Sequence, residues 1–291
     1  MSHGIIESIG LEEWMTTPPG QYLMAWEKKQ FDRTVADIFG FHALQLGLTS
    51  FEGLDTNRMP YKWTAKVFEN KEYSQLPQLL DEKDSGSKVT DVTNVTDPKK
   101  YSLILDSRAL PFPDQSIDLI LLPHTLEISP DPHATLREVE RVLVPEGRVV
   151  ISGLNPVSLW GFCQIRVNAY RSLGLDTSFL PQEGDFIAYR RLRDWLKLLS
   201  FEVEGGRFGV YRPAFKTQTW LNRFAWMDNA GDRWWPIFGS VYFLLAVKRV
   251  RGMKMVGPVW KRPHARARSA VAGINSSAAN KVENSLASTE N

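Results

Sequence analysis

A regular alternation of short apolar runs and one helical pattern between residues 101 and 153 constrains the fold of this chain most strongly. Residues 101–105 and 117–122 are typical of strands buried on both faces, and residues 148–151 form a third such run. A helical pattern over residues 132–143 separates the second run from the third. Parallel neighbours need a long return connection, so this alternation predicts a parallel sheet with crossover helices.

The helix predicted within this passage has clear start and stop signals. Asp131 is a favourable N-cap, and Pro132 suits the first helical position. Leu136 and Val139 lie on one stripe, and Gly147 is the predicted stop just beyond the end.

The rest of the chain predicts a Rossmann-like α/β fold, with a mostly parallel seven-stranded sheet, helices on both faces and an antiparallel edge strand. We expect an N-terminal helical segment at 1–39, a domain at 40–250 with a flexible insertion at 69–100, and a disordered basic and polar tail at 251–291. The remaining expected strands are 41–48, 58–68, 201–210 and 239–249, and the remaining helical patterns are 21–39, 73–80, 156–173 and 187–199.

Charge is unevenly distributed, which bears on the class of partner. The net charge is +2, yet residues 1–247 hold 26 Lys and Arg against 31 Asp and Glu. Eight basic and no acidic residues follow between Lys248 and Arg268. A body with net charge −5 disfavours a nucleic-acid substrate held by many phosphate contacts, and we interpret the basic stretch as a solvated tail.

A single cysteine, Cys163, excludes an internal disulfide and fits a reducing, cytoplasmic location. The longest apolar run, residues 237–247, is shorter than the roughly 20 residues of a membrane-spanning helix, so no transmembrane segment is predicted. Five scattered histidines and one cysteine give no metal-ligand spacing.

The nine residues D-S-R-A-L-P-F-P-D, 106–114, resemble the D-A-x-x-L-P-F-P-D block of class I S-adenosylmethionine-dependent methyltransferases. The resemblance implies that the Asp106 carboxylate accepts a hydrogen bond from the adenine amino group of S-adenosylmethionine. It also implies that the following residues line the adenine ring. These residues are Ser107, Arg108, Ala109 and Leu110.

The run L-Q-L-G-L-T-S, 44–50, resembles the first motif of the same family only in part. Gln45 stands where an acidic residue is usual, and Gly47 matches the first glycine. A glycine there lets the backbone approach the cofactor closely, so both residues are candidate cofactor-binding residues. An ordinary glycine at the end of a strand is the alternative interpretation.

His124 follows the fourth strand, where the methyl group of the cofactor usually lies in this family. Histidine titrates near neutral pH, so His124 is the candidate catalytic base. It could instead contact the methionine end of the cofactor, or be a loop histidine with a structural partner.

The resemblance is closest to the broad small-molecule branch, typified by quinone and lipid-precursor methyltransferases, and to uncharacterised bacterial members with a degraded glycine motif. It implies S-adenosylmethionine-dependent methyl transfer to a small, apolar or aromatic acceptor. Two alternatives remain: a non-catalytic relative that uses the fold for binding or regulation, and a nucleic-acid methyltransferase recruited by the basic tail. The sequence assigns no partner protein.

Overall fold

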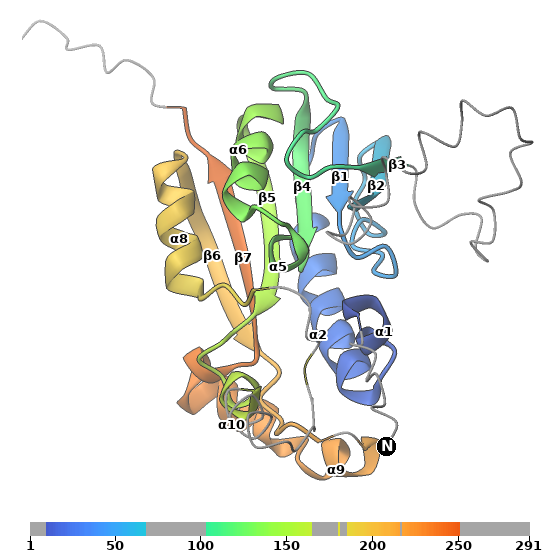
Figure 1. Ribbon diagram of the computed structural model, residues 1–291, viewed down its shortest axis with the longest axis vertical. Helices are drawn as coiled ribbons and strands as arrows, with labels where there is room; N and C mark the ends of the chain where they lie inside the picture. Colours follow the sequence, from blue (N-terminus) through green and yellow to red (C-terminus); the bar gives the residue numbers. More distant parts are fainter. Residues whose placement is uncertain (1–9, 68–102, 165–179, 181–184, 216, 251–291) are drawn as a thin grey trace, which may run out of the picture. The chain divides into compact units, whose positions relative to one another are not determined.

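The computed structural model describes residues 10–67, 103–164, 180, 185–215 and 217–250 of the chain. Its centre is a seven-stranded sheet in the order β3-β2-β1-β4-β5-β7-β6 (Figure 1). The strands are β1 His42–Leu46, β2 Tyr61–Val67, β3 Leu103–Leu105, β4 Ile117–Pro123, β5 Leu143–Leu154, β6 Phe201–Gly209 and β7 Val241–Lys248.

Strand direction confirms the predicted fold class. The pairs β1–β2, β2–β3, β1–β4 and β4–β5 are all parallel. Strand β7 runs antiparallel to both β5 and β6, as expected for the last two strands of the chain. Strand order reverses between β1 and β4, and open α/β sheets bind ligands beyond the carboxyl ends of the strands at such a point.

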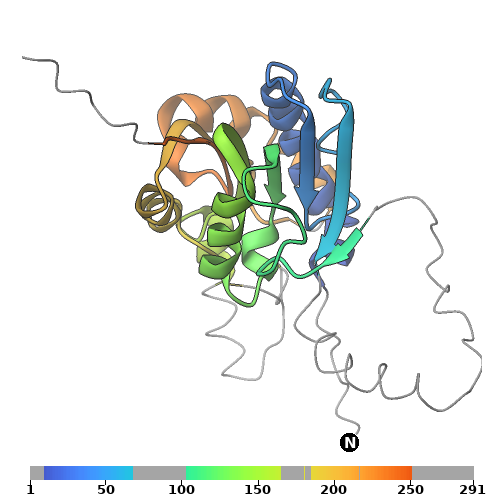
Figure 2. The same ribbon diagram turned by 90° about the horizontal axis from the view of Figure 1, so that it is seen from above.

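Helices cover both faces of the sheet (Figure 2). One face carries α1 Leu11–Met15 and α2 Pro18–Val35, and the other carries α5 Thr125–Ile128, α6 Pro132–Val142 and α8 Tyr189–Leu198. The chain between β6 and β7 forms α9 Gln218–Arg223, α10 Trp226–Trp234 and the short 3-10 helix η2 Pro236–Phe238. The sequence patterns did not predict α1, α9 or α10.

Helix α6 begins as predicted but ends differently. The Asp131 side chain accepts hydrogen bonds from the backbone N–H groups of His133 and Ala134, both at 3.0 Å. The prediction that Gly147 stops this helix was wrong, because the backbone is already extended at Leu143. Leu143 pairs with Ile117 of β4, so β5 starts directly after the helix and Gly147 lies within the strand.

The connection between β1 and β2, residues 47–60, contains no helix, which differs from the expected strand–helix alternation. Its apolar side chains Phe51, Leu54 and Met59 are buried in the same cluster as Leu23 and Phe31 of α2. Phe31 and Phe51 make an edge-to-face contact with ring centroids 4.9 Å apart. Helix α2, which precedes β1 in the chain, therefore covers this part of the sheet together with the loop.

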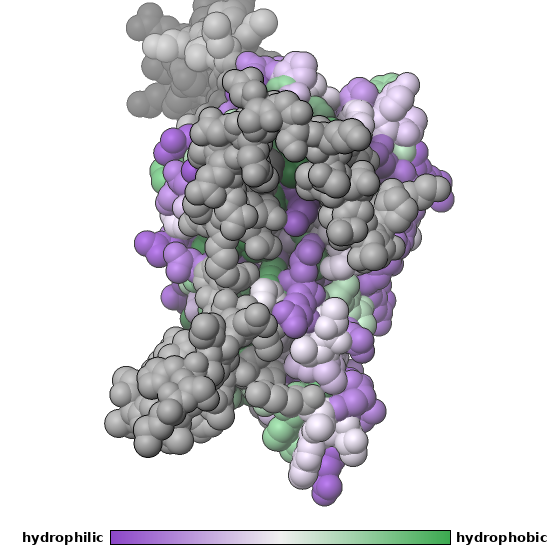
Figure 3. Space-filling view, turned by 45° about the vertical axis from the view of Figure 1, so that its right-hand side comes forward, coloured by the Kyte–Doolittle hydropathy of each residue, from purple (hydrophilic) through white to green (hydrophobic). Residues whose placement is uncertain are grey.

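Several predicted segments lie outside the described residues: the insertion 69–100 with its helix 73–80, the tail 251–291 and the second half of the pattern 156–173. Among the described helices, none is long and apolar enough to cross a membrane. On the side seen in Figure 3, the described surface is mostly hydrophilic, with small separate hydrophobic patches.

Candidate cofactor site

The fold brings the predicted site residues to one edge of the sheet. Strands β1, β2, β3 and β4 are parallel, so their carboxyl ends lie at the same edge. Gln45 and Gly47 lie at the end of β1, Asp106 follows β3, and His124 follows β4. The side chains at these strand ends have different surroundings.

Asp106 lies at the end of the short strand β3 with a partly accessible carboxylate. Its Oδ1 accepts hydrogen bonds from the backbone N–H and the Nε of Arg108, at 2.9 and 3.1 Å. Its Oδ2 lies 3.0 Å from Nη2 of the same guanidinium, and the side chain is 26% exposed. Arg108 therefore folds back onto Asp106 and fixes the direction of the carboxylate.

Ser107 points into the protein rather than towards a cofactor. It is fully buried, and its hydroxyl lies 2.9 Å from the hydroxyl of Thr135 and 3.3 Å from that of Ser129. Ser129 and Thr135 are themselves 2.8 Å apart, which closes a triangle of hydroxyl groups. This triangle ties the turn after β3 to the end of α5 and the first turn of α6.

Two residues of α6 hold the rest of the 106–114 block. The Glu138 carboxylate accepts a hydrogen bond from the Leu110 N–H at 3.0 Å, and Arg141 donates to the Leu110 carbonyl at 3.0 Å. Arg141 also pairs with Glu138 at 2.8 Å and with Asp114 at 2.5 Å. Glu138 and Arg141, one helical turn apart, are thus a structural pair. Between these anchors Ala109 is exposed, and Leu110 is 4% exposed.

Gln45, a predicted cofactor-binding residue, directs its amide into the β1–β2 loop. Its Nε2 donates to the carbonyls of Leu48, at 3.0 Å, and Phe51. Its Oε1 accepts from the N–H of Gly53 at 2.9 Å. The side chain, 1% exposed, thus acts as the internal support of a loop that has no helix.

Gly47 has a backbone conformation that favours glycine. Protein atoms, however, occupy the position where a side chain would lie. Its φ of 98° lies in the left-handed region, which L side chains rarely adopt. A Cβ placed there would lie 2.6 Å from the Thr125 hydroxyl. That hydroxyl donates to the Leu46 carbonyl at 2.5 Å, so the ends of β1 and β4 are joined directly.

His124, the predicted catalytic base, is fully buried between two carboxylates. Its Nδ1 lies 2.8 Å from Oε2 of Glu127, and its Nε2 lies 3.1 Å from Oε1 of Glu27 on α2. Burial lowers the pKa of His124, but the negative charges of Glu27 and Glu127 outweigh it and raise the pKa to about 10. A charged histidine with both nitrogens facing carboxylates is arranged to hold α2 and α5 on β4, which favours a positioning role over proton transfer.

The sequence analysis missed both carboxylate partners of His124. Glu127 stands three residues after His124, a spacing that places side chains together on one helical turn, so it left a usable signal. No sequence signal indicated Glu27, because its contact with His124 depends on how α2 packs against the sheet. Both oxygens of Glu27 are buried, and apart from the ion pair with His124 they have no partner among the described residues. With one cation between two carboxylates, this cluster keeps a net negative charge at the end of β4.

Asn155, which follows β5, has a structural role. Its amide donates to the carbonyls of Ile237 and Gly239, both at 2.9 Å, and its oxygen accepts from the Val157 N–H at 3.1 Å. It therefore shapes the turn after β5. No group of three or more potential metal ligands occurs in the described part of the chain.

Comparison with known proteins gives a family match for part of the chain. Residues 87–151 match the family model described as a methyltransferase domain. Over 144 residues the chain is 35% identical to an uncharacterized protein of Escherichia coli strain K12, YafS, and the match covers 50% of this chain and 53% of YafS. The chain thus matches about half the length of this curated relative.

Solved structures with similar folds include two S-adenosylmethionine-dependent methyltransferases. The protein from Thermotoga maritima is 13% identical, with a TM-score of 0.46 over 78% of this chain and 92% of that one. The protein from Archaeoglobus fulgidus is 15% identical, with a TM-score of 0.46 over 77% of this chain and 94% of that one.

The matched segment contains the 106–114 block, β4, α6 and most of β5. The family match and the order of the strands agree with the resemblance to class I S-adenosylmethionine-dependent methyltransferases, a family whose cofactor is S-adenosylmethionine.

Proposed function

We propose that the chain binds S-adenosylmethionine along the carboxyl ends of β1, β3 and β4 and methylates a small, apolar or aromatic acceptor. The observation that supports this most directly is Asp106. It lies in the family-matched segment at the end of β3, and its carboxylate is oriented by Arg108 yet still 26% exposed. A carboxylate in that place can accept the adenine amino group, while Ala109 and Leu110 offer an apolar edge to the ring.

The second supporting observation is the net negative charge at the end of β4. Glu27 and Glu127 share a single cation, His124, and apart from it the Glu27 oxygens have no partner among the described residues. The methionine end of the cofactor carries an ammonium, a carboxylate and a sulfonium group, so its net positive charge fits this cluster. When bound, S-adenosylmethionine supplies an electrophilic methyl group on the sulfonium sulfur.

Side chains after β5 support the apolar character of the acceptor. Val157, Leu159 and Phe162 are 59, 44 and 65% exposed, and they follow the carboxyl end of β5, next to β4 in the sheet. Exposed apolar side chains beside a ligand-binding edge are a suitable contact for an apolar molecule. No described side chain offers a free base there, which fits an acceptor that reacts when correctly aligned with the methyl group.

Calorimetric titration with S-adenosylhomocysteine, the demethylated product, tests this proposal. We expect wild-type binding, and we expect Asp106→Ala to weaken it by about 1–2 kcal/mol through the lost hydrogen bond to a charged group. The matched control is Asp194→Ala, which removes an exposed carboxylate from α8. Equal affinities of the two variants would contradict the assignment of Asp106, and no wild-type binding at millimolar ligand would contradict cofactor binding itself.

One group of contacts favours a second candidate, a non-catalytic protein that keeps the fold for binding or regulation. Gln45, Gly47 and His124 are all engaged by neighbouring protein groups, and α2 seals the end of β4. If the ends of β1 and β4 stay closed, adenosine should bind through the Asp106 end as well as S-adenosylhomocysteine does. A clear preference for S-adenosylhomocysteine over adenosine would exclude this candidate.

A further inference from the structure

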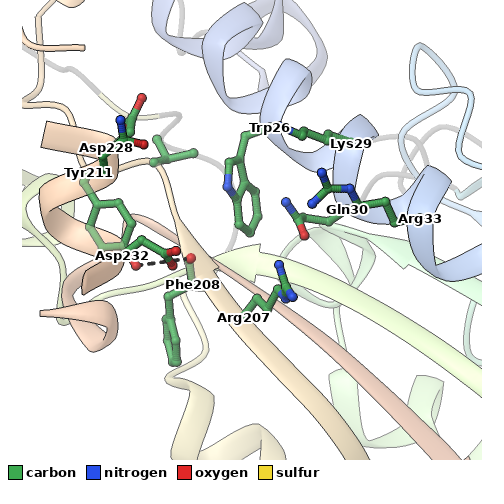
Figure 4. A pocket seen from close by; sticks show the side chains of 11 residues that line it. Trp26, Lys29, Gln30, Arg33, Arg207, Phe208, Tyr211, Asp228 and Asp232 are labelled. Carbon is green, nitrogen blue, oxygen red and sulfur yellow. Dashed lines mark hydrogen bonds between the residues drawn. The ribbon is translucent and has the colours of Figure 1, made fainter. Parts of the chain in front are cut away.

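A cavity lies between α2, the end of β6 and α10, at the far end of the same sheet edge (Figure 4). Its volume is about 360 Å³, within the range of roughly 300–1,000 Å³ that is usual for small-molecule sites. Strands β5 and β7 separate β6 from β4 in the sheet. The residues that line the cavity include neither Asp106 nor His124, so it is a different site on this edge.

Three cations without ion-pair partners among the described residues border this cavity. Lys29 and Arg33 stand one helical turn apart on the exposed side of α2, and Arg207 comes from β6. In Figure 4, Arg33 and Arg207 approach the cavity from the same side of Trp26. Like charges gathered in this way repel one another, so an anion bound among them would be stabilised.

Carboxylates from α10 border the opposite side. Asp228 is neutralised by Arg212, at 3.0 and 2.9 Å, and also accepts from the Tyr22 hydroxyl. Asp232 has no ion pair with any described residue. Its charge acts on Tyr211, whose pKa is raised to about 12, first by burial and then by Asp232 and Asp228. The uncompensated charges of the cavity are thus three cations and one carboxylate.

Trp26 lies between these two charged sides (Figure 4). Its indole packs against the backbone of Gly209, where a Cβ would come within 2.0 Å of the ring. Because Gly209 has no side chain, the indole ring of Trp26 can lie directly against its backbone. An aromatic ring in a cavity wall offers a stacking surface to a planar ligand.

We propose that this cavity binds a small phosphate monoester that carries a planar ring and hydroxyl groups, of the size of a mononucleotide. A phosphate monoester carries a charge of about −1.5 to −2 at pH 7, which complements the excess of cations. Lys29, Arg33 and Arg207 would hold the phosphate, since guanidinium groups match phosphate oxygens in pairs. The ring would stack on Trp26, and a hydroxyl would donate to Asp232.

Calorimetric titration of the full chain with guanosine 5′-monophosphate (GMP), in a buffer without phosphate, tests the proposal. Guanine has a carbonyl at C6, where adenine has the amino group that Asp106 is expected to bind. GMP therefore distinguishes the cavity from the cofactor site. We expect guanosine, which lacks the phosphate, and inorganic phosphate, which lacks the ring, each to bind at least about tenfold more weakly than GMP. Binding of pyridoxine 5′-phosphate more tightly than GMP would support the same site with a ring that is not a nucleobase.

The double variant Arg33→Gln/Arg207→Gln should weaken GMP binding by at least about tenfold and leave S-adenosylhomocysteine binding unchanged. The control is Arg193→Gln, which removes an exposed arginine of α8 and should change neither affinity. Circular dichroism melting verifies that the variants are folded. The proposal is overturned if guanosine or inorganic phosphate binds as tightly as GMP, if no phosphate ester binds, or if the double variant binds GMP like the wild type.

Discussion

The end of β3 and the ends of β1 and β4 belong to the same edge of the sheet, but their polar groups are arranged differently. At β3 the Asp106 carboxylate is held by a neighbouring arginine and remains partly accessible. At β1 and β4, Gln45 and His124 have inward partners and are 1 and 0% exposed. In the proposed binding mode, the adenine end of the cofactor would meet an accessible carboxylate, and its methionine end would meet strand ends that the N-terminal helix α2 closes.

The largest loss of stability is expected from removing His124, the cation between the two carboxylates at the end of β4. His124→Ala leaves the carboxylates of Glu27 and Glu127 buried without a cation, and we expect a loss of about 3–5 kcal/mol in the free energy of unfolding. Urea denaturation measures it. His133→Ala is the control, because His133 is exposed on α6, and it should cost less than about 1 kcal/mol. Similar costs for the two variants would show that the ionic cluster does not stabilise the fold.

Raising the pH tests the same centre without mutation. The pKa of a histidine in an unfolded chain is about 6.5, whereas the pKa of His124 in the folded protein is about 10. The stabilisation from protonated His124 is therefore complete below about pH 6.5 and is lost as the pH rises through about 10. We expect wild-type stability to fall over this window, and His124→Asn to show a smaller fall. Parallel pH profiles for the two proteins would contradict the raised pKa.

A substitution where the ends of β1 and β4 meet should destabilise the protein slightly less than the loss of His124. Gly47→Val places a β-branched side chain at a φ of 98° and against the Thr125 hydroxyl, so we expect a loss of about 2–4 kcal/mol. Gly205→Val in β6 is the matched control, because a Cβ there meets nothing within 4 Å. Thermal melting of both variants gives the comparison. A Gly47→Val protein as stable as Gly205→Val would show that the two strand ends are not tightly joined.

The accessible end should show the smallest effect on stability. Asp106→Ala removes a half-exposed pair with Arg108, and such pairs contribute about 1 kcal/mol or less. We expect a shift in the melting temperature of only a few degrees, combined with the weaker binding of S-adenosylhomocysteine described above. A loss of stability as large as that of Gly47→Val would remove the distinction between the two ends.

Much of the fold could be predicted from the sequence, because β4, α6 and their neighbours carry their signals locally. Asp131 and Pro132 begin a helix by capping and by fixed φ, and the apolar run of β4 is long enough to be buried on both faces. The stop at Gly147 was predicted wrongly, and β5 starts earlier than predicted, because Leu143 suits both a helix and a strand. Pairing with Ile117, a tertiary contact, decides between them.

The candidate site was less predictable than the fold. The motif gave the positions of Asp106, Gly47 and His124 along the chain, and the parallel strands bring them to one edge. It could not show which side chains turn inward, since that depends on partners distant in sequence. Glu27 and Thr135 are such partners, 97 residues before His124 and 28 residues after Ser107.

The loop between β1 and β2 is supported by the amide of Gln45, which connects Leu48, Phe51 and Gly53 in the absence of a helix. A helix distributes its hydrogen bonds along its length, and its ends can fray while the middle persists. Three hydrogen bonds that meet at one amide cannot break one after another in this way, because one rotation of the Gln45 side chain breaks all of them. Residues 47–53 should therefore open as a single cooperative unit, with the Gly53 amide proton exchanging only in that opening.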